Sequence, residues 1–428
     1  MDTIFAQATA VGRAGVSIVR ISGPLAFEVS SKLAGNLPKP RVSGLRRIVG
    51  RDGAFLDEAL VLGFAGPNSF TGEDIVELHL HGSIAILRRI LSELALFTDV
   101  RLAEPGEFTR RALANGRLDL TQVEGLADLI DAETEAQRKQ ALRVLSGDLG
   151  KKVEGWRAKL IRAASLLEAT IDFADEDVPI DVSDEVLGLL KSVHNDLLGE
   201  IEGSFAAERV RTGFEVAIVG APNVGKSTLL NRIAGRDAAI TSSIAGTTRD
   251  VIEVRMDLGG LPVTLLDTAG IRESSDEIEN IGVDLALRRA EVADLRIFLV
   301  DAGDTPVRPP KDGDIVVFAK ADLGTTGYPC ISGQTGAGVS ELLDAVESRL
   351  GTVAGSIGVA THMRHTEAMR GAKKAIDAAF TLLIDGPGSY DITAEELRIG
   401  IRQLESLVGR VDVENLLDEI FSSFCLGK

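Results

Sequence analysis

Residues 220–227 have the types and spacing needed to bind a phosphate chain. They read Gly-Ala-Pro-Asn-Val-Gly-Lys-Ser, after a segment typical of a strand (215–219) and before one typical of a helix. Glycines let backbone N–H groups approach phosphate oxygens, and the helix N-terminus adds partial positive charge. We expect Lys226 to reach the β and γ phosphates and Ser227 to bind Mg²⁺. The alternative is a chance glycine-rich turn, against which the flanking strand and helix argue.

Three later segments indicate which nucleotide is bound. The segment 246–250, Gly-Thr-Thr-Arg-Asp, supplies a threonine, Thr248, for Mg²⁺ and the γ phosphate. The segment 267–270, Asp-Thr-Ala-Gly, follows the strand-like VTLLD and places a carboxylate near the metal. The segment 319–322, Ala-Lys-Ala-Asp, follows the strand-like DIVVF. The Asp322 carboxylate can accept both the ring N–H and the exocyclic amine of guanine.

Together these motifs resemble the small-GTPase superfamily and predict a bound guanine nucleotide. Mg²⁺ is expected on Ser227 and Thr248. The last base-binding loop matches more loosely, at residues 332–336. The residues expected to bind GTP are Asn223, Val224, Gly225, Lys226, Ser227, Thr228, Ser242, Ser243, Ile244, Ala245, Gly246, Thr247, Thr248, Asp267, Thr268, Ala269, Gly270, Lys320, Asp322, Ser332 and Gly333.

Two positions depart from the superfamily pattern. An Asn that ties the base-reading loop to the phosphate loop is replaced by Ala319. Losing such a bond costs about 1 kcal/mol, so we expect guanine specificity to be kept through Asp322 and affinity to be weakened. The position after Asp-x-x-Gly, often a water-orienting Gln, is Ile271. An acid within 272–279 could orient the water instead, or this segment is a solvated loop.

The pattern of strands and helices divides the chain into four segments. Residues 1–118 mix strand-like and helix-like segments, and residues 119–212 are helical, with one helix expected over 120–145. Residues 213–352 alternate strands and helices, as in a parallel doubly wound sheet, and residues 353–428 are helical again. We therefore expect a multidomain α/β protein in which a GTPase domain is inserted into one helical domain.

The net charge of −18 excludes a generally basic nucleic-acid coat. The four segments carry +2, −9, −8 and −3 in chain order, with the division at residue 350. The only cysteines, Cys330 and Cys425, are far apart in sequence, which favours a reducing compartment over a disulfide framework. No apolar run approaches the roughly 20 residues of a membrane span, and the N-terminus is unlike a signal peptide. A cytoplasmic protein is expected.

Several long segments extend the resemblance over residues 2–428. They include SFTGEDIVELHLHGS, EPGEFTRRALANGRLDLTQVEGLADLIDAETEAQRKQALRVLSG, IAGTTRD, DTAGIRESSDEIENIG and the terminal FCLGK. The chain resembles the MnmE (TrmE) family of tRNA uridine-modification GTPases. The resemblance implies an N-terminal α+β folate-binding domain similar to the glycine-cleavage aminomethyltransferase, an all-α helical domain, and an inserted Ras-like P-loop GTPase domain.

The resemblance also implies the reaction. The family forms homodimers through its N-terminal domains and acts with a flavin-dependent partner, MnmG (GidA), so that FAD enters only through the partner. It adds an aminomethyl-type (carboxymethylaminomethyl) group to C5 of the wobble uridine (U34) of certain tRNAs while GTP is hydrolysed to GDP and phosphate. The carbon comes from a tetrahydrofolate derivative, in the 5,10-methylene or 5-formyl form.

The resemblance assigns roles to further residues. The family's GTPase is activated by K⁺, whose ligands here would be Asn223, Thr247 and the backbone oxygens of Ser242 and Ile244. Its water-orienting acid corresponds to Glu279. Glu279, Lys226, Thr248 and Cys425 are thus the expected catalytic residues, the exact role of Cys425 being left open. Arg20, Glu77, Arg117 and Lys428 are expected to bind folate, because arginines pair with the glutamate tail and Glu can hold the pterin.

Two other functions are compatible with parts of the sequence. A regulatory GTPase switch in ribosome assembly predicts a basic RNA-binding appendage, which the four segment charges do not supply. A free-standing folate-dependent aminomethyltransferase with a vestigial GTPase conflicts with the intact Lys226, Ser227 and Thr248. The acidic middle of the chain further suggests that tRNA is held mainly by the partner, with the target base delivered to the first segment.

Overall fold

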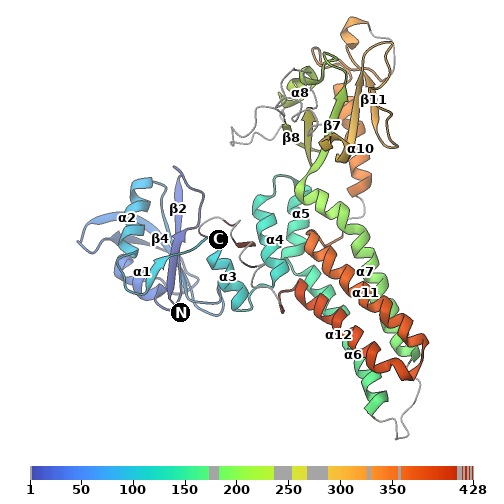
Figure 1. Cartoon of the computed structure of the whole chain (residues 1–428). Coiled ribbons are helices and arrows are strands. Elements are labelled where there is room, and N and C mark those ends of the chain that lie inside the picture. The colour runs from blue at the N-terminus through green and yellow to red at the C-terminus, as the bar shows by residue number, and fades with distance from the viewer. Residues whose placement is uncertain are drawn as a thin grey trace, which may run out of the picture. The chain divides into compact units, whose positions relative to one another are not determined.

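The computed structural model describes residues 2–172, 183–235, 253–267, 288–324, 329–354 and 358–411, together with Leu417, Ile420, Phe421, Phe424 and Gly427. The chain forms two compact units. The first consists of residues 1–127 and 405–428, and the second of residues 128–404. Figure 1 traces both units along the chain.

A six-stranded sheet forms the centre of the first unit, in the order β3-β4-β5-β2-β1-β6. All neighbouring strands are antiparallel except β1 and β6. The strands are β1 (Thr3–Gln7), β2 (Val16–Ser22), β3 (Gly44–Val49), β4 (Phe55–Phe64), β5 (Ile75–His81) and β6 (Val100–Leu102). The mixture of strands and helices predicted for residues 1–118 is thus confirmed.

One face of this sheet is covered by helices α1 (Ala26–Ala34) and α2 (Ile84–Leu94). Alternation along β2 and β5 turns Val19, Ile21 and Leu78 into this core. The intervening residues Arg20 and Glu77 therefore point to the opposite face. Helices α3 (Glu107–Ala114) and α4 (Leu120–Asp131) follow β6 along the chain.

The predicted single helix over 120–145 is wrong, because the chain forms two helices there. α4 ends at Asp131, and α5 (Glu135–Leu145) begins after Thr134. The Thr134 hydroxyl accepts from the Gln137 backbone N–H, and the Gln137 side chain accepts from the Thr134 N–H at 3.0 Å. This capping box starts a new helix, and it is readable as T-x-x-Q in the sequence.

Long helices form the helical domain of the second unit, which is called the helical host below. They are α6 (Asp148–Asp172), α7 (Ser183–Thr212), α11 (Met363–Ile384) and α12 (Tyr390–Leu407), which lie side by side in Figure 1. Small residues on α11 and α12 allow close approach, with Ala375 next to Gly400. The helical character predicted for residues 119–212 and 353–428 is confirmed over these helices.

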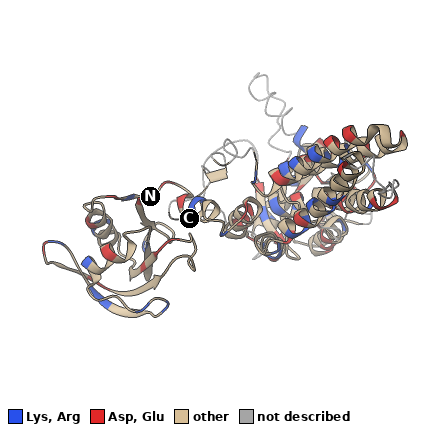
Figure 2. Ribbon diagram, turned by 90° about the horizontal axis from the view of Figure 1, so that it is seen from below, with Lys and Arg blue, Asp and Glu red and all other residues tan. Residues whose placement is uncertain are grey.

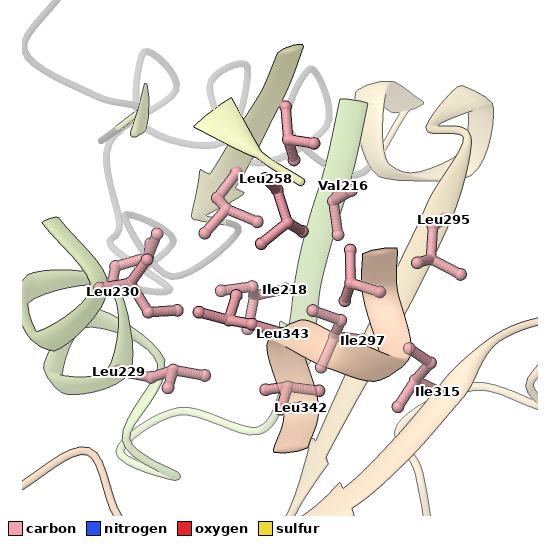
Figure 3. Close-up of a cluster of buried hydrophobic side chains, with 14 of the residues drawn as sticks. Val216, Ile218, Leu229, Leu230, Leu258, Leu295, Ile297, Ile315, Leu342 and Leu343 are labelled. Atoms are coloured by element: carbon pink, nitrogen blue, oxygen red, sulfur yellow. The ribbon is translucent and has the colours of Figure 1, made fainter. Parts of the chain in front are cut away.

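The rest of the second unit, residues 213–354, is the segment predicted to form the GTPase domain and is called the GTPase part below. It contains a five-stranded sheet in the order β11-β10-β7-β9-β8. Its strands are β7 (Phe214–Gly220), β8 (Glu253–Leu258), β9 (Leu261–Asp267), β10 (Leu295–Val300) and β11 (Ile315–Phe318), with only β8 antiparallel to its neighbour. Helices α8 (Lys226–Ala234) and α10 (Val339–Ala354) pack on one face. Figure 3 shows Leu229 of α8, Ile218 of β7 and Leu342 of α10 in that core.

The GTPase part enters and leaves the helical host at one place, the C-terminal half of α7. The chain passes from Thr212 into β7, and it returns after α10 at residues 358–361. The Gly358 N–H donates to the Gly203 carbonyl at 3.3 Å, and the Arg211 guanidinium donates to the Thr361 carbonyl at 2.9 Å. The predicted insertion of a GTPase domain into a helical domain is confirmed.

Charges are interspersed rather than gathered on the helical host. Figure 2 shows basic and acidic residues alternating along its helices. Many form ion pairs between helices, such as Arg398 with Glu168 and Arg162 with Glu185. Among the described residues, no helix combines the length and the apolar character that a membrane crossing requires.

Candidate functional site

The phosphate loop lies between the end of β7 and the start of α8. Strand β7 is buried on both faces of the sheet, which fixes the position from which the loop departs. Gly225 has a φ of 111°, a conformation that residues with a Cβ rarely adopt. Helix α8 begins at the next residue, so its free N–H groups face the loop.

Lys226 is buried across this loop. Its ammonium donates hydrogen bonds to the carbonyls of Gly220 at 2.6 Å and Ala221 at 2.8 Å. Burial lowers the pKa of the Lys226 ammonium, while the nearby Asp267 carboxylate acts in the opposite direction. A phosphate chain in the loop would restore the preference for the charged form, which fits the predicted role of Lys226.

Ser227 and Asp267 meet although they are 40 residues apart. The Ser227 hydroxyl donates to an Asp267 carboxylate oxygen at 2.9 Å. Asp267 is the last residue of β9, which lies next to β7 in the sheet, so the parallel strands bring both groups to the same edge. A hydroxyl and a carboxylate are oxygen donors of the kind that Mg²⁺ prefers. These two residues therefore fit the predicted magnesium site.

A cavity of about 240 Å³ opens beside the loop. Seven of the predicted GTP-binding residues line it: Asn223, Val224, Gly225, Thr228, Lys320, Asp322 and Gly333. Lys320 has a φ of 60° and its ammonium pairs with Asp301, whose pKa this hydrogen bond lowers. Ser332 is fully buried, and its hydroxyl accepts from the Thr335 N–H at 3.1 Å. The arrangement suits a planar base that meets Asp322 at one edge.

Sequence motifs missed the apolar wall of this cavity. It is formed by Leu229, Leu299, Leu323 and Ile331, next to Ala319 of the predicted segment 319–322. Leu299 and Ile331 come from β10 and from the bridge beside β11. These residues look like ordinary core positions in the sequence, so no local signal distinguishes them. Buried Ala319 occupies the position at which the superfamily has Asn.

Arg20 and Glu77 meet on the face of the N-terminal sheet opposite α1 and α2, beside Phe70 and Phe108. They are directly opposite each other in the β2–β5 pairing, and the Arg20 guanidinium donates to the Glu77 carboxylate at 2.9 Å. The guanidinium also lies 5.5 Å from the centre of the Phe70 ring. His79 is next to this pair, 3.4 Å from the Glu77 carboxylate. The structure thus brings together two of the predicted folate-binding residues.

Arg117 and the C-terminal tail approach the same sheet from other elements. The exposed Arg117 side chain packs on the backbone at Gly72, two residues after Phe70. Gly427 packs directly on the carbonyl of Gln7 at the end of β1, leaving no room for a side chain. The residue before Lys428 therefore lies at this sheet, as the prediction for the tail requires.

Several predicted site residues lie outside the described part of the chain. For the nucleotide and metal ions they are Ser242, Ser243, Ile244, Ala245, Gly246, Thr247, Thr248, Thr268, Ala269 and Gly270, and for the other roles Glu279, Cys425 and Lys428. Their assignments stay predictions.

Comparisons with known proteins cover the whole chain. A family model described as "GTP-binding protein TrmE N-terminus" matches residues 3–117, and one described as "MnmE helical domain" matches residues 120–425. The chain belongs to the MnmE family. The tRNA modification GTPase MnmE of Roseobacter denitrificans is 61% identical over 428 residues, and that of Ruegeria pomeroyi is 60% identical over 429 residues, with full coverage of both chains.

Two solved structures each match about a third of the chain. Era of Aquifex aeolicus bound to GDP·AlF4⁻ is 31% identical, covering 32% of this chain and 56% of that chain at a TM-score of 0.25. The G domain of the T. maritima FeoB iron transporter is 23% identical, covering 33% of this chain and 98% of that chain at a TM-score of 0.24. As an MnmE family member, the chain is a GTP-binding hydrolase that acts in tRNA modification. The predicted enzyme class and architecture are confirmed.

Proposed function

We propose that this chain is a potassium-activated GTPase that adds an aminomethyl-type group to C5 of the wobble uridine of certain tRNAs. It does so with a tetrahydrofolate one-carbon donor and a flavin-dependent partner of the MnmG type. The observation that carries the proposal is that one chain holds both a nucleotide cavity and a partly exposed charge pair, Arg20 with Glu77, on the N-terminal sheet. A regulatory GTPase alone has no use for the second feature.

In the GTPase part, each described residue has a defined task. Lys226 would neutralise the β and γ phosphates, and Asp322 would select guanine. Ser227 and Thr248 would hold Mg²⁺, with Asp267 close to the metal through its hydrogen bond to Ser227. Asn223 lines the cavity with a φ of 61°, which places its side chain on a loop rather than in a strand or helix. Its amide oxygen suits a K⁺ ligand, shared with Thr247 and the carbonyls of Ser242 and Ile244. That cation supplies the positive charge that an arginine finger gives elsewhere, and Glu279 orients the water.

In the N-terminal part, Arg20 and Glu77 have complementary tasks toward folate. The guanidinium can pair with a carboxylate of the glutamate tail, and the Glu77 carboxylate can accept from the donor edge of the pterin. In the free protein each satisfies the other, so folate would replace their ion pair with one ion pair to Arg20 and hydrogen bonds to Glu77. Arg117, Cys425 and Lys428 complete the proposed site.

The proposed assembly is a homodimer through the N-terminal units that also binds the flavoprotein and tRNA. The chain would then divide into residues 1–118 for folate and dimerisation, 119–212 and 353–428 for the helical domain, and 213–352 for the GTPase. The charges of these segments support tRNA contact mainly by the partner, because the helical and GTPase segments are acidic.

GTP turnover in K⁺ and in Na⁺ tests the cation. We expect K⁺ to raise kcat, and Asn223→Ala to remove that difference while GDP still binds. Asn36→Ala, which changes an amide in the other unit, is the matched control. Equal turnover in both salts for the unaltered protein would contradict potassium activation without affecting the GTPase assignment.

Nucleoside analysis of tRNA tests the reaction. Cells lacking this chain should lack the wobble modification and keep normal ribosomal subunits. A plasmid copy should restore the modification, and a copy with Arg20→Ala should restore it poorly. Normal tRNA with defective ribosomes would instead favour the ribosome-assembly function.

A further inference from the structure

The last base-binding loop, residues 332–336, packs directly against helix α8. Gly333 is the contact point, where a Cβ would come within 2.8 Å of the Leu229 backbone nitrogen and 3.0 Å of the Thr228 carbonyl carbon. Helix α8 carries the end of the phosphate loop at its first residues. The position of this loop relative to the phosphate loop is therefore set by backbone contact on α8.

Arg232 fastens this contact from the exposed side of α8. Its Nε donates to the Gly333 carbonyl at 3.3 Å, and a terminal nitrogen donates to the Gln334 carbonyl. Gly336 packs against the same guanidinium, because a Cβ built on Gly336 would lie 3.5 Å from the Arg232 Nε, an ordinary van der Waals distance. One planar side chain thus binds two successive carbonyls of the loop 332–336. The residues that carry these carbonyls, Gly333 and Gln334, both line the nucleotide cavity.

The segment 319–322 has no side chain at position 319 that could bind the phosphate loop. Buried Ala319 has only a methyl group at the position where the superfamily has an amide. Its backbone N–H is used within the sheet, donating to Val300 at 2.8 Å. The Ala319 side chain therefore cannot link the segment 319–322 to the phosphate loop.

We propose that Arg232 replaces the missing amide of position 319 as the positioning residue that ties the base-reading loops to the phosphate loop. The connection runs from Arg232 to the loop 332–336, and from there to the segment 319–322, because the Ala321 N–H donates to the Ile331 carbonyl at 3.0 Å. Arg232 does not itself line the nucleotide cavity. This inference rests on the proposed guanine site, in which Asp322 reads the base.

Release and binding of fluorescent GDP by the full-length chain with Mg²⁺ test the proposal. Arg232→Ala should weaken GDP affinity about fivefold to tenfold, mainly through faster release. Arg349→Ala is the matched control, because Arg349 makes the same kind of exposed contact to a carbonyl, that of Gly313, on helix α10 of the same domain. Arg349→Ala should leave affinity unchanged.

Rescue distinguishes positioning from a general loss of structure. Ala319→Asn should restore GDP affinity in the Arg232→Ala protein, by a larger factor than it gains in the unaltered protein. If the two changes are simply additive, or if Arg232→Ala releases GDP at the normal rate, the proposal is wrong. Arg232→Lys, which can reach one carbonyl, keeps the test open if Arg232→Ala does not fold, and should give an intermediate release rate.

The guanine site is tested separately in the same assay. The unaltered protein should prefer GDP to ADP, and Asp322→Asn should remove that preference. If there is no preference to begin with, the guanine site is wrongly placed. If the preference depends on Asp322 but Arg232→Ala has no effect, only the role of Arg232 is overturned.

Discussion

The nucleotide cavity and the Arg20–Glu77 pair of the N-terminal sheet are assembled in different ways. Most predicted residues of the cavity come from short motifs at the ends of parallel strands, where the chain itself places them together. Arg20 and Glu77 are 57 residues apart and meet only because β2 and β5 pair in one register. A shift of that register by one residue would turn one of the two side chains into the core and separate the pair.

This difference explains what each site can tolerate. The phosphate loop depends on a few residues whose backbone conformation is fixed, so a single substitution there removes a whole function. The Arg20–Glu77 pair is partly exposed, with side chains 23% and 14% accessible, so solvent screens it and each member contributes less. Substitutions in the cavity should therefore have larger effects than those on the sheet.

The largest effect is expected from Lys226→Ala. This change removes the only charge that the loop directs at the β and γ phosphates, so kcat for GTP hydrolysis should fall about 10²- to 10³-fold. Phosphate release at saturating GTP and Mg²⁺ measures it. Arg289→Ala, at an ion pair with Glu215 in the same domain, should keep normal turnover. A fall of less than fivefold would mean that the loop does not carry the reaction.

Asp322→Asn should lower GTP affinity about 100-fold, because two hydrogen bonds to a charged group are lost. Xanthine has a carbonyl where guanine has an amine, and the Asn amide can donate to it. The same variant should therefore bind xanthosine triphosphate better than GTP. Competition between the two nucleotides measures this reversal, and an unchanged preference for GTP would exclude Asp322 as the base-reading residue.

Arg20→Ala should lower affinity for 5-formyltetrahydrofolate about tenfold, the size of one partly exposed charge-assisted contact. Equilibrium dialysis with the labelled folate gives the value. Arg47→Ala, on the edge strand β3 of the same sheet, serves as the control and should bind normally. An effect as large as that of Lys226→Ala on turnover would erase the contrast between the two sites.

Ala319→Asn should raise GDP affinity about threefold to fivefold in the unaltered background, since an amide regains one hydrogen bond to the phosphate loop. Fluorescent GDP release provides the measurement. An unchanged release rate would show that the loss of the superfamily Asn has no cost here.

The smallest effect is a change in proton uptake. Burial lowers the pKa of Lys226 in the free protein, whereas a bound phosphate chain favours the charged form. Binding should therefore take up a fraction of a proton at alkaline pH, and affinity should fall as pH rises through the lowered pKa. Calorimetry in two buffers of different ionisation enthalpy detects it. Lys226→Arg should abolish it, because an arginine stays charged.

Much of the GTPase part could be predicted from the sequence because its information is local. The phosphate loop, the strand ends and the contact between Ser227 and Asp267 follow from motifs whose spacing dictates their geometry. The signal that separates α4 from α5 is also local, because it is the capping box that begins at Thr134. Helical periodicity on both sides of Thr134 concealed that signal.

The rest depends on packing between distant segments. The apolar wall of Leu299 and Ile331, and the contact of Arg232 with the loop 332–336, arise only when β10, β11 and α8 are in place. No spacing rule connects Arg232 with Gln334, which is 102 residues later. The pair of Arg20 and Glu77 could be named only by family resemblance, and its register is visible only in the folded sheet.

The meeting of both ends of the GTPase part on helix α7 has a practical consequence. The chain leaves α7 after Thr212 and returns at Thr361, whose carbonyl accepts a hydrogen bond from Arg211. The GTPase is thus a side branch of a host whose own helices continue past it. A gene in which a short glycine linker replaces residues 213–360 would encode the host alone, and the excised cassette would have neighbouring termini. The nucleotide cavity and the folate site proposed for the N-terminal sheet would then lie on two polypeptides that can be studied one at a time.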